Sequence, residues 1–322
     1  MSQRALLQTK AAIAPPGSAN PPGRAEVVLS KPDAKPGELD RILATPKFNQ
    51  WWDSVNRTEG LDYIIGSVDI RDANWFGPTN LGFFKADCKV YRLEPNAGDI
   101  PDFALDAKGQ HATVPAIAFV RGGAVAILVK VTVHEPNKSY FILTSQIRFP
   151  VGQFCLETAA GMLDGSGDFK GVAAKEIEEE LGIKINAEEL HDLGRFFPSP
   201  GGCDEFIQMY YYETTISQAV FDKKQRSVFG SSSESEHIVL QFVPEKQMSS
   251  VLLKIGDAKA EIAYRRYLLA KRRARAASCG YSAKTARCGV KYAGTNPDYC
   301  TYNEDTARCR VVASKRKTKP AT

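Results

Sequence analysis

One segment, residues 161–183, limits what this chain can fold into more than any other part of the sequence. Ala173, Ile177 and Leu181 recur at intervals of four residues, which places them along one buried stripe of a helix. Gly182 follows directly and is typical of a helix C-cap. We therefore expect a glycine-rich loop that leads into a helix packed on a hydrophobic core.

The same helix carries a run of carboxylates. Glu176, Glu179 and Glu180 fall within one narrow helical face. Carboxylates at these spacings repel one another and weaken an isolated helix. A divalent cation such as Mg²⁺ reverses that penalty, because it prefers carboxylate oxygens and bound phosphate as ligands. A run of Glu is also typical of a solvated helix face, so the helix alone leaves both interpretations open.

Strand patterns and helix patterns alternate along the rest of the chain, which predicts an α/β domain. Alternating or β-branched and aromatic runs predict strands, and longer periodic runs predict helices. The expected strands are residues 63–70, 83–91, 115–120, 124–133, 139–146, 206–214 and 239–243, and the expected helices, besides the acidic one, are 38–48 and 258–276.

Composition divides the chain into parts. We expect a disordered, Pro-rich leader over residues 1–36, an N-terminal β subdomain over 37–114, a catalytic domain over 115–276 and a basic tail over 277–322. No run of 18 apolar residues occurs, which argues against a membrane span. The sequence favours a cytoplasmic location and leaves organellar and nuclear ones open.

The end of the chain holds the basic charge and a repeat. Residues 270–322 contain 13 Lys and Arg against three acidic residues, a net charge of +10 in a chain whose total is +5. Such a tail is a possible nucleic-acid contact. The pattern C-x-Y-x-x-x-T-A-R-C occurs twice, and its four cysteines could bind zinc or close two disulfide hairpins; they are Cys279, Cys288, Cys300 and Cys309.

Gly161 and the run K-E-I-E-E-E-L-G-I at residues 175–183 resemble the Nudix box, G-x5-E-x7-R-E-U-x-E-E-x-G-U, in which U is aliphatic. The resemblance implies a Nudix fold, a mixed β-sheet sandwiched between helices, with a small N-terminal β subdomain. Two positions depart from the box: Gly167 replaces the first Glu, and Lys175 replaces the Arg. Lys175 keeps the charge but loses the bidentate fork of an Arg, so reduced activity is one expected consequence.

By this resemblance, Glu176 and Glu180 are direct ligands of Mg²⁺ or Mn²⁺, and Glu179 supports the metal and catalysis. The L-E-x-x-A-G-M segment at residues 156–162 is similar to the lead-in of ADP-ribose and ADP-sugar pyrophosphatases. In that subfamily the carbonyl before the first Gly of the box is also a ligand, which here is the carbonyl of Ala160.

The segment S-P-G-G-x-x-E at residues 199–205 resembles the same subfamily, and it implies substrate contacts from Gly201, Gly202 and Glu205. An acidic loop further on, S-E-S-E-H-I, resembles the loop that carries the catalytic carboxylate. Glu236 is the first candidate for the general base and Glu234 the second, and an exposed acidic loop is the alternative.

Three further residues are candidate substrate contacts. Arg121 and Arg148 would bind phosphate or ribose, and Trp75 would stack on adenine; a structural role is the alternative for each. The N-terminal segments resemble plant-type ADP-sugar diphosphatases, which implies a homodimer that forms through the N-terminal sheet and in which both chains build the pocket.

We therefore expect Mg²⁺-dependent hydrolysis of the diphosphate of an ADP-sugar or ADP-ribose to AMP and a sugar phosphate. Two alternatives stay open. One is an RNA-directed Nudix hydrolase that removes caps, which the basic tail favours. The other is a nucleotide-binding module without turnover, which the departures at Gly167 and Lys175 favour.

Overall fold

The computed structural model describes most of the chain. The described residues are 3–8, 26–31, 35–56, 63–94, 102–135, 137–163, 168–225, 228–229, 238–278, 281–282, 287–288, 300–303 and 308–311. The chain forms two compact units. The first comprises residues 1–126, 160–188 and 194–208, and the second comprises 127–159, 189–193 and 209–322. Within the described ranges, no helix has both the length and the apolar character needed to cross a bilayer.

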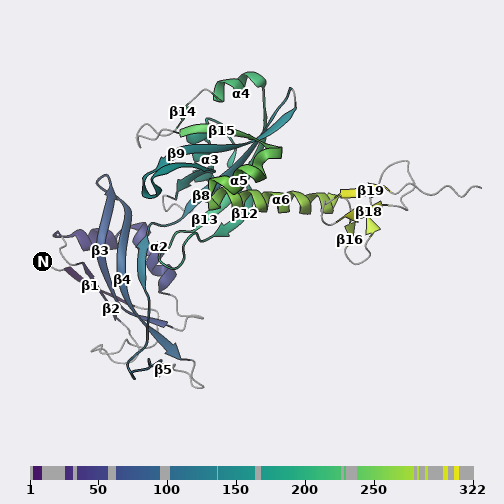
Figure 1. Ribbon diagram of the computed structural model, residues 1–322. Coiled ribbons are helices and arrows are strands. Elements are labelled where there is room, and N and C mark those ends of the chain that lie inside the picture. Colours follow the sequence, from purple (N-terminus) through teal and green to yellow (C-terminus); the bar gives the residue numbers. More distant parts are fainter. Residues whose placement is uncertain are drawn as a thin grey trace, which may run out of the picture. The chain divides into compact units, whose positions relative to one another are not determined.

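The first unit is built on a seven-stranded sheet, with strand order β1-β2-β3-β4-β5 and with β6 and β7 also paired to β4 (Figure 1). Its two longest strands, β3 and β4, form an antiparallel hairpin. The strands are β1 (Gln3–Gln8), β2 (Glu26–Lys31), β3 (Tyr63–Phe76), β4 (Asn80–Glu94), β5 (Asp102–Phe103), β6 (Thr113–Val114) and β7 (Ile117–Val120).

Two strands lie in the part of the chain that the sequence analysis expects to be a disordered leader. β1 pairs antiparallel with β2, and β2 pairs parallel with β3. This expectation was therefore wrong for residues 3–8 and 26–31. The physical reason is pairing at a sheet edge, because the backbone ladder supplies hydrogen bonds that do not depend on apolar periodicity.

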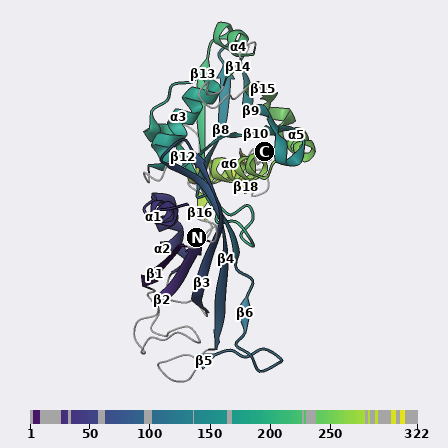
Figure 2. The ribbon, with the colours of Figure 1, turned by 90° about the vertical axis from the view of Figure 1, so that its left-hand side faces the viewer.

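Helices α1 (Glu38–Leu43) and α2 (Pro46–Val55) pack against this sheet (Figure 2). A single helix over residues 38–48 was the wrong prediction, because Thr45 ends one helix and caps the next. Its hydroxyl accepts a hydrogen bond from the amide of Phe48 at 3.2 Å, and Pro46 occupies the first helical position. The core beneath is aromatic; the ring of Trp51 meets the ring of Phe84 edge-on at 5.4 Å.

The second sheet has eight strands in the order β12-β13-β8-β9-β15-β14, with β10 paired to β9 and β11 paired to β8. Strand β8 is buried along most of its length, as expected of a central strand. The strands are β8 (Ala124–Val133), β9 (Lys138–Arg148), β10 (Gln153–Glu157), β11 (Ala159–Met162), β12 (His191–Phe196), β13 (Ile207–Ile216), β14 (Val228–Phe229) and β15 (Ile238–Pro244).

Four helices accompany these strands: α3 (Phe169–Leu181), α4 (Gln218–Lys224), α5 (Met248–Ile255) and α6 (Ala258–Ser278). Helix α6 buries a stripe at helical spacing that includes Tyr264 and Tyr267. Both rings meet Phe141 of β9 edge-on, at centroid distances of 5.3 and 5.4 Å. Aromatic packing therefore fixes α6 on the strand that continues to Arg148.

The repeat in the tail forms two small hairpins, β16 (Tyr281–Ser282) with β17 (Arg287–Cys288) and β18 (Cys300–Asn303) with β19 (Arg308–Val311). Tyr281 pairs with Cys288, and Tyr302 pairs with Cys309. Both copies of the repeat thus fold in the same register. Cys279 lies outside the described residues.

All seven predicted strands have counterparts, as do the acidic helix and the long helix near residue 258. Several short elements were not expected, among them β10, β11 and β12. The α/β class is confirmed, because the described residues combine β-sheets with helices.

Candidate active site

Helix α3 is held at both ends by backbone hydrogen bonds. At its start, the carboxylate of Asp168 accepts a hydrogen bond from the amide of Gly171 at 2.8 Å. At its end, Gly182 adopts the left-handed conformation and its amide bonds to the carbonyl of Glu178. Ala173, Ile177 and Leu181 are all fully buried, so the predicted stripe is confirmed. The rotation of the helix about its axis is therefore fixed.

That rotation places the three candidate carboxylates in different surroundings. Glu180 is only 3% exposed, and Glu176 is half-buried. Glu179 is exposed and pairs with Lys175 at 3.3 Å. An exposed pair of this kind contributes little to stability. Glu176 and Glu180 thus lie on the protected side of the helix, and Glu179 lies at its margin.

Gly161 lies directly against the carboxylate of Glu176. A methyl group at position 161 would overlap that carboxylate, so no residue larger than glycine fits here without a shift. Gly161 follows Ala160 in β11. The close approach therefore sets the Glu176 carboxylate beside the backbone that carries the Ala160 carbonyl.

This donor set fits a hard divalent cation. Two carboxylates and a backbone carbonyl are oxygen ligands of the kind that Mg²⁺ and Mn²⁺ prefer. Within the described ranges, no three His, Cys, Asp or Glu side chains already converge as a metal cluster. The candidates Glu234 and Glu236 lie outside the described residues, as does Gly167.

The segment around Gly202 is attached to β7 by its backbone. The amide of Phe119 donates to the carbonyl of Gly202 at 2.8 Å, and the amide of Asp204 donates to the carbonyl of Phe119 at 3.3 Å. Gly201 and Gly202 face open space, because a methyl group at either position would meet no atom within 4 Å. Packing within the protein therefore does not require glycine at these two positions.

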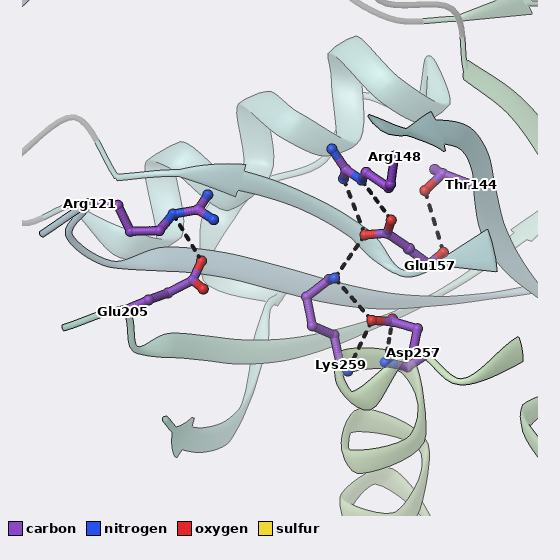
Figure 3. Close-up of polar contacts among 8 residues, drawn as sticks. Arg121, Thr144, Arg148, Glu157, Glu205, Asp257 and Lys259 are labelled. Atoms are coloured by element: carbon purple, nitrogen blue, oxygen red, sulfur yellow. Dashed lines mark hydrogen bonds and ion pairs between the residues drawn. The ribbon is translucent and has the colours of Figure 1, made fainter. Parts of the chain in front are cut away.

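Next to this segment, the turn that follows β7 carries Arg121. Its backbone amide and that of Gly122 donate to the Asp204 carboxylate at 2.8 and 3.1 Å. Burial raises the pKa of the Asp204 carboxyl, although these amide hydrogen bonds oppose the rise. The side chain of Arg121 pairs with Glu205 at 3.4 Å (Figure 3). Glu205, predicted to contact substrate, thus contacts Arg121.

Phe206 connects this turn to helix α3. A methyl group at Gly123 would overlap the Phe206 ring, and the Gly123 carbonyl accepts a hydrogen bond from the amide of Leu163 at 3.0 Å. The Phe206 ring lies 6.1 Å from Phe169 at the start of α3, and the Arg195 guanidinium lies 4.0 Å above it. Four separate segments of the sequence are thereby brought together around residues 121–123.

In the second unit, Arg148 belongs to a buried polar network (Figure 3). Its guanidinium donates to both oxygens of Glu157, with Nε at 2.7 Å from Oε1 and Nη2 at 3.1 Å from Oε2. Lys259 donates to the same Oε2 at 2.7 Å and to Asp257 at 3.0 Å. Asp257 and Lys259 were not predicted from the sequence, because no local pattern relates Lys259 in α6 to a carboxylate 102 residues away.

Both buried charges of this network are stabilised in their ionised forms. Burial raises the pKa of the Glu157 carboxyl, but the hydrogen bonds from Arg148 and the charge of Lys259 outweigh burial and hold that pKa below its ordinary value. Burial lowers the pKa of Lys259, but the charges of Asp257 and Glu157 outweigh it and raise that pKa. Glu157 and Lys259 are therefore both ionised at neutral pH.

Trp75, the candidate for adenine stacking, is already covered on one face. The Arg41 guanidinium lies 4.3 Å above its ring and donates to the carbonyl of Pro78 at 2.8 Å. Beside it lies a shallow cavity of about 250 Å³, lined by Arg41, Ala44, Thr45, Pro46, Trp75, Pro78 and Thr79. The stacking role of Trp75 stays a prediction.

Comparison with known proteins gives the following similarities. No family model matches the chain. The chain is 31% identical over 239 residues to "Nudix hydrolase 14, chloroplastic" of Arabidopsis thaliana, a match that covers 70% of this chain and 71% of that protein. It is 28% identical over 151 residues to the ADP-ribose pyrophosphatase of Haemophilus influenzae, covering 44% of this chain and 64% of the other. The chain is also similar to a solved ADP compounds hydrolase at 14% identity and a TM-score of 0.41, in a match that covers 63% of this chain and 95% of that one.

Proposed function

Because this chain belongs to the Nudix hydrolase family, we propose that it hydrolyses the diphosphate of an ADP-sugar or ADP-ribose with the help of Mg²⁺ or Mn²⁺. The observation that carries the proposal is the contact between Gly161 and the Glu176 carboxylate, next to the buried Glu180. The ADP-ribose pyrophosphatase similar to this chain supports the class of substrate.

In this proposal Glu176 and Glu180 hold the metal together with the Ala160 carbonyl. A bound Mg²⁺ or Mn²⁺ would offset the charge of the diphosphate and lower the pKa of a bound water. Glu236, or Glu234 as the alternative, accepts a proton from the attacking water. The water oxygen bonds to phosphorus as a phosphorus–oxygen bond of the diphosphate breaks. AMP and a sugar phosphate are the products.

Two glycines and two arginines are proposed to bind the substrate. Gly201 and Gly202 leave their backbone open to a ligand. Arg121 and Arg148 carry the positive charge that a diphosphate needs, and their side chains are 34% and 40% exposed. The exposure leaves part of each guanidinium accessible to an anion.

The test is turnover of a panel of ADP-ribose, ADP-glucose, UDP-glucose and capped RNA in Mg²⁺. Glu180→Gln keeps the size of the side chain and removes its charge, so we expect turnover to fall by about 10²-fold or more without loss of folding. Glu178→Gln is the matched control, because Glu178 is exposed on the same helix. Unchanged turnover in Glu180→Gln would contradict the assignment.

One alternative keeps support from a specific contact. Lys175 pairs with Glu179 as a single ion pair at 3.3 Å and cannot form the fork that an Arg makes. A chain that binds ADP-ribose but hydrolyses none of the panel would be a nucleotide-binding module. Turnover of capped RNA alone would instead favour the RNA-directed alternative.

A further inference from the structure

The network around Glu157 links the partly exposed Arg148 to the start of helix α6. The side chain of Glu157 is 6% exposed, that of Asp257 is 11% and that of Lys259 is 20%, whereas Arg148 is 40% exposed. The network therefore runs from a buried end at Asp257 to an accessible end at a guanidinium.

The geometry fixes how Arg148 is oriented. Two parallel hydrogen bonds to one carboxylate hold the plane of a guanidinium. Two further hydrogen bonds restrain Glu157. Lys259 donates to Oε2 of its carboxylate, and the hydroxyl of Thr144 donates to its backbone carbonyl at 3.4 Å. Lys259 in turn is anchored by Asp257 at 3.0 Å. Each member thus limits the motion of the next.

The charges of the network bear on Arg148 as well. A carboxylate that pairs with a single guanidinium cancels most of its charge, which would make Arg148 a poor ligand for an anion. Lys259 brings a second positive charge to the same carboxylate. The negative charge of Asp257 is offset by the amides of Lys259 and Ala260, which donate to it at the N-terminus of α6. Arg148 and Lys259 therefore share the negative charge of one carboxylate.

We propose that Lys259, anchored by Asp257, is a positioning residue for substrate binding: through Glu157 it holds the Arg148 guanidinium in place and leaves it able to bind the diphosphate. The inference rests on the proposed function in one respect, since it takes Arg148 to be a phosphate contact. Lys259 itself touches no substrate in this account.

The experiment compares Lys259→Met, Lys259→Arg, Arg148→Met and the double variant Lys259→Met/Arg148→Met. Removal of a hydrogen bond to a charged group predicts a rise of about tenfold in the KM for ADP-ribose in Lys259→Met, with kcat changed by less than about threefold. Lys259→Arg should recover most of the loss. Because Lys259 acts through Arg148, the double variant should be no worse than Arg148→Met.

Lys271→Met is the matched control. Lys271 lies on the same helix and makes an equally short ion pair, 2.6 Å to Glu213, and its loss should leave KM unchanged. If Lys259→Met does not fold, Asp257→Asn serves instead, because Asn still caps a helix but anchors Lys259 less strongly; a smaller rise in KM is expected. An additive loss in the double variant, or a lower Tm in Lys259→Met with unchanged KM, would overturn the proposal.

Calorimetric binding of ADP-ribose in EDTA separates this inference from the proposed function. A wild-type chain that turns over no nucleotide sugar contradicts the proposed function. The inference then stands if Lys259→Met weakens ADP-ribose binding by about tenfold and Lys271→Met does not. It fails if the wild-type chain binds no ADP-ribose, or if both variants bind it as the wild type does.

Discussion

At the scale of single residues, the Glu176 carboxylate leaves no room for a side chain at Gly161. Ala at position 161 would push the Glu176 carboxylate away from the backbone of β11. A displacement of about 1 Å in a catalytic group can cost about 10²-fold in rate, and we expect a loss of this order in Gly161→Ala, together with a higher Mg²⁺ requirement. A titration of turnover against Mg²⁺ measures both.

Gly82→Ala is the control for a methyl group that meets a neighbouring side chain away from the candidate metal ligands. A methyl group at Gly82 would lie 2.8 Å from the ring of Phe76, which is 47% exposed and free to shift outward. This variant should fold and keep the Mg²⁺ requirement of the wild type. If Gly161→Ala keeps it too, the packing of Glu176 on Gly161 does not position a metal ligand.

The ionised state of Glu157 predicts a dependence of stability on pH. Its pKa in the folded chain lies below the ordinary value of 4.5, so the folded state binds a proton less readily than the unfolded state. The stabilisation is therefore fully present above about pH 4.5 and is lost as pH falls through the lower, folded-state pKa. The difference in Tm between wild type and Glu157→Gln should be constant near neutral pH and should shrink on acidification. A difference that stays the same down to pH 3 would contradict this prediction.

At the scale of elements, the sequence predicted what local periodicity encodes. The stripe of α3 and its cap at Gly182 follow from residues within one helix, and both are present. Strand β12 escaped prediction because half of its residues are polar and exposed and do not alternate with buried ones. The break between α1 and α2 depends on one side-chain cap at Thr45, which a helical pattern across residues 38–48 conceals.

Some residues of the candidate site could likewise be predicted from the sequence, and others could not. The resemblance to the Nudix box singled out Glu176 and Glu180 as candidate ligands, and the structure adds that Glu180 is buried whereas Glu179 is exposed. Asp257 and Lys259 could not be identified, because their role depends on α6 packing beside Glu157. Tertiary contacts of this kind leave no pattern in a single sequence.

At the scale of the whole molecule, the β9–β10 hairpin exposes more apolar surface than a loop usually does. Phe149 is 90% exposed and Phe154 is 74% exposed, and Ile147 and Val151 on the same hairpin are more than half exposed. Phe154 pairs with Ile147 across the two strands, so both lie on one face. Clustered apolar residues on a surface are typical of a binding interface. We infer that this hairpin contributes to the homodimer that the family resemblance implies.

The double variant Phe149→Ser/Phe154→Ser should therefore shift the chain from dimer to monomer, because each buried aromatic ring contributes about 1.5–3 kcal/mol to an interface. Sedimentation velocity measures the change in mass. Leu253→Ser is the control, since Leu253 in α5 is 80% exposed but lies on a different element, and this variant should remain dimeric. A wild-type chain that sediments as a monomer, or a double variant that still sediments as a dimer, would exclude the hairpin as the interface. If both chains build the pocket, the monomeric variant should also lose turnover while keeping its Tm. An active site that belongs to one chain and only lies near the interface would keep its turnover.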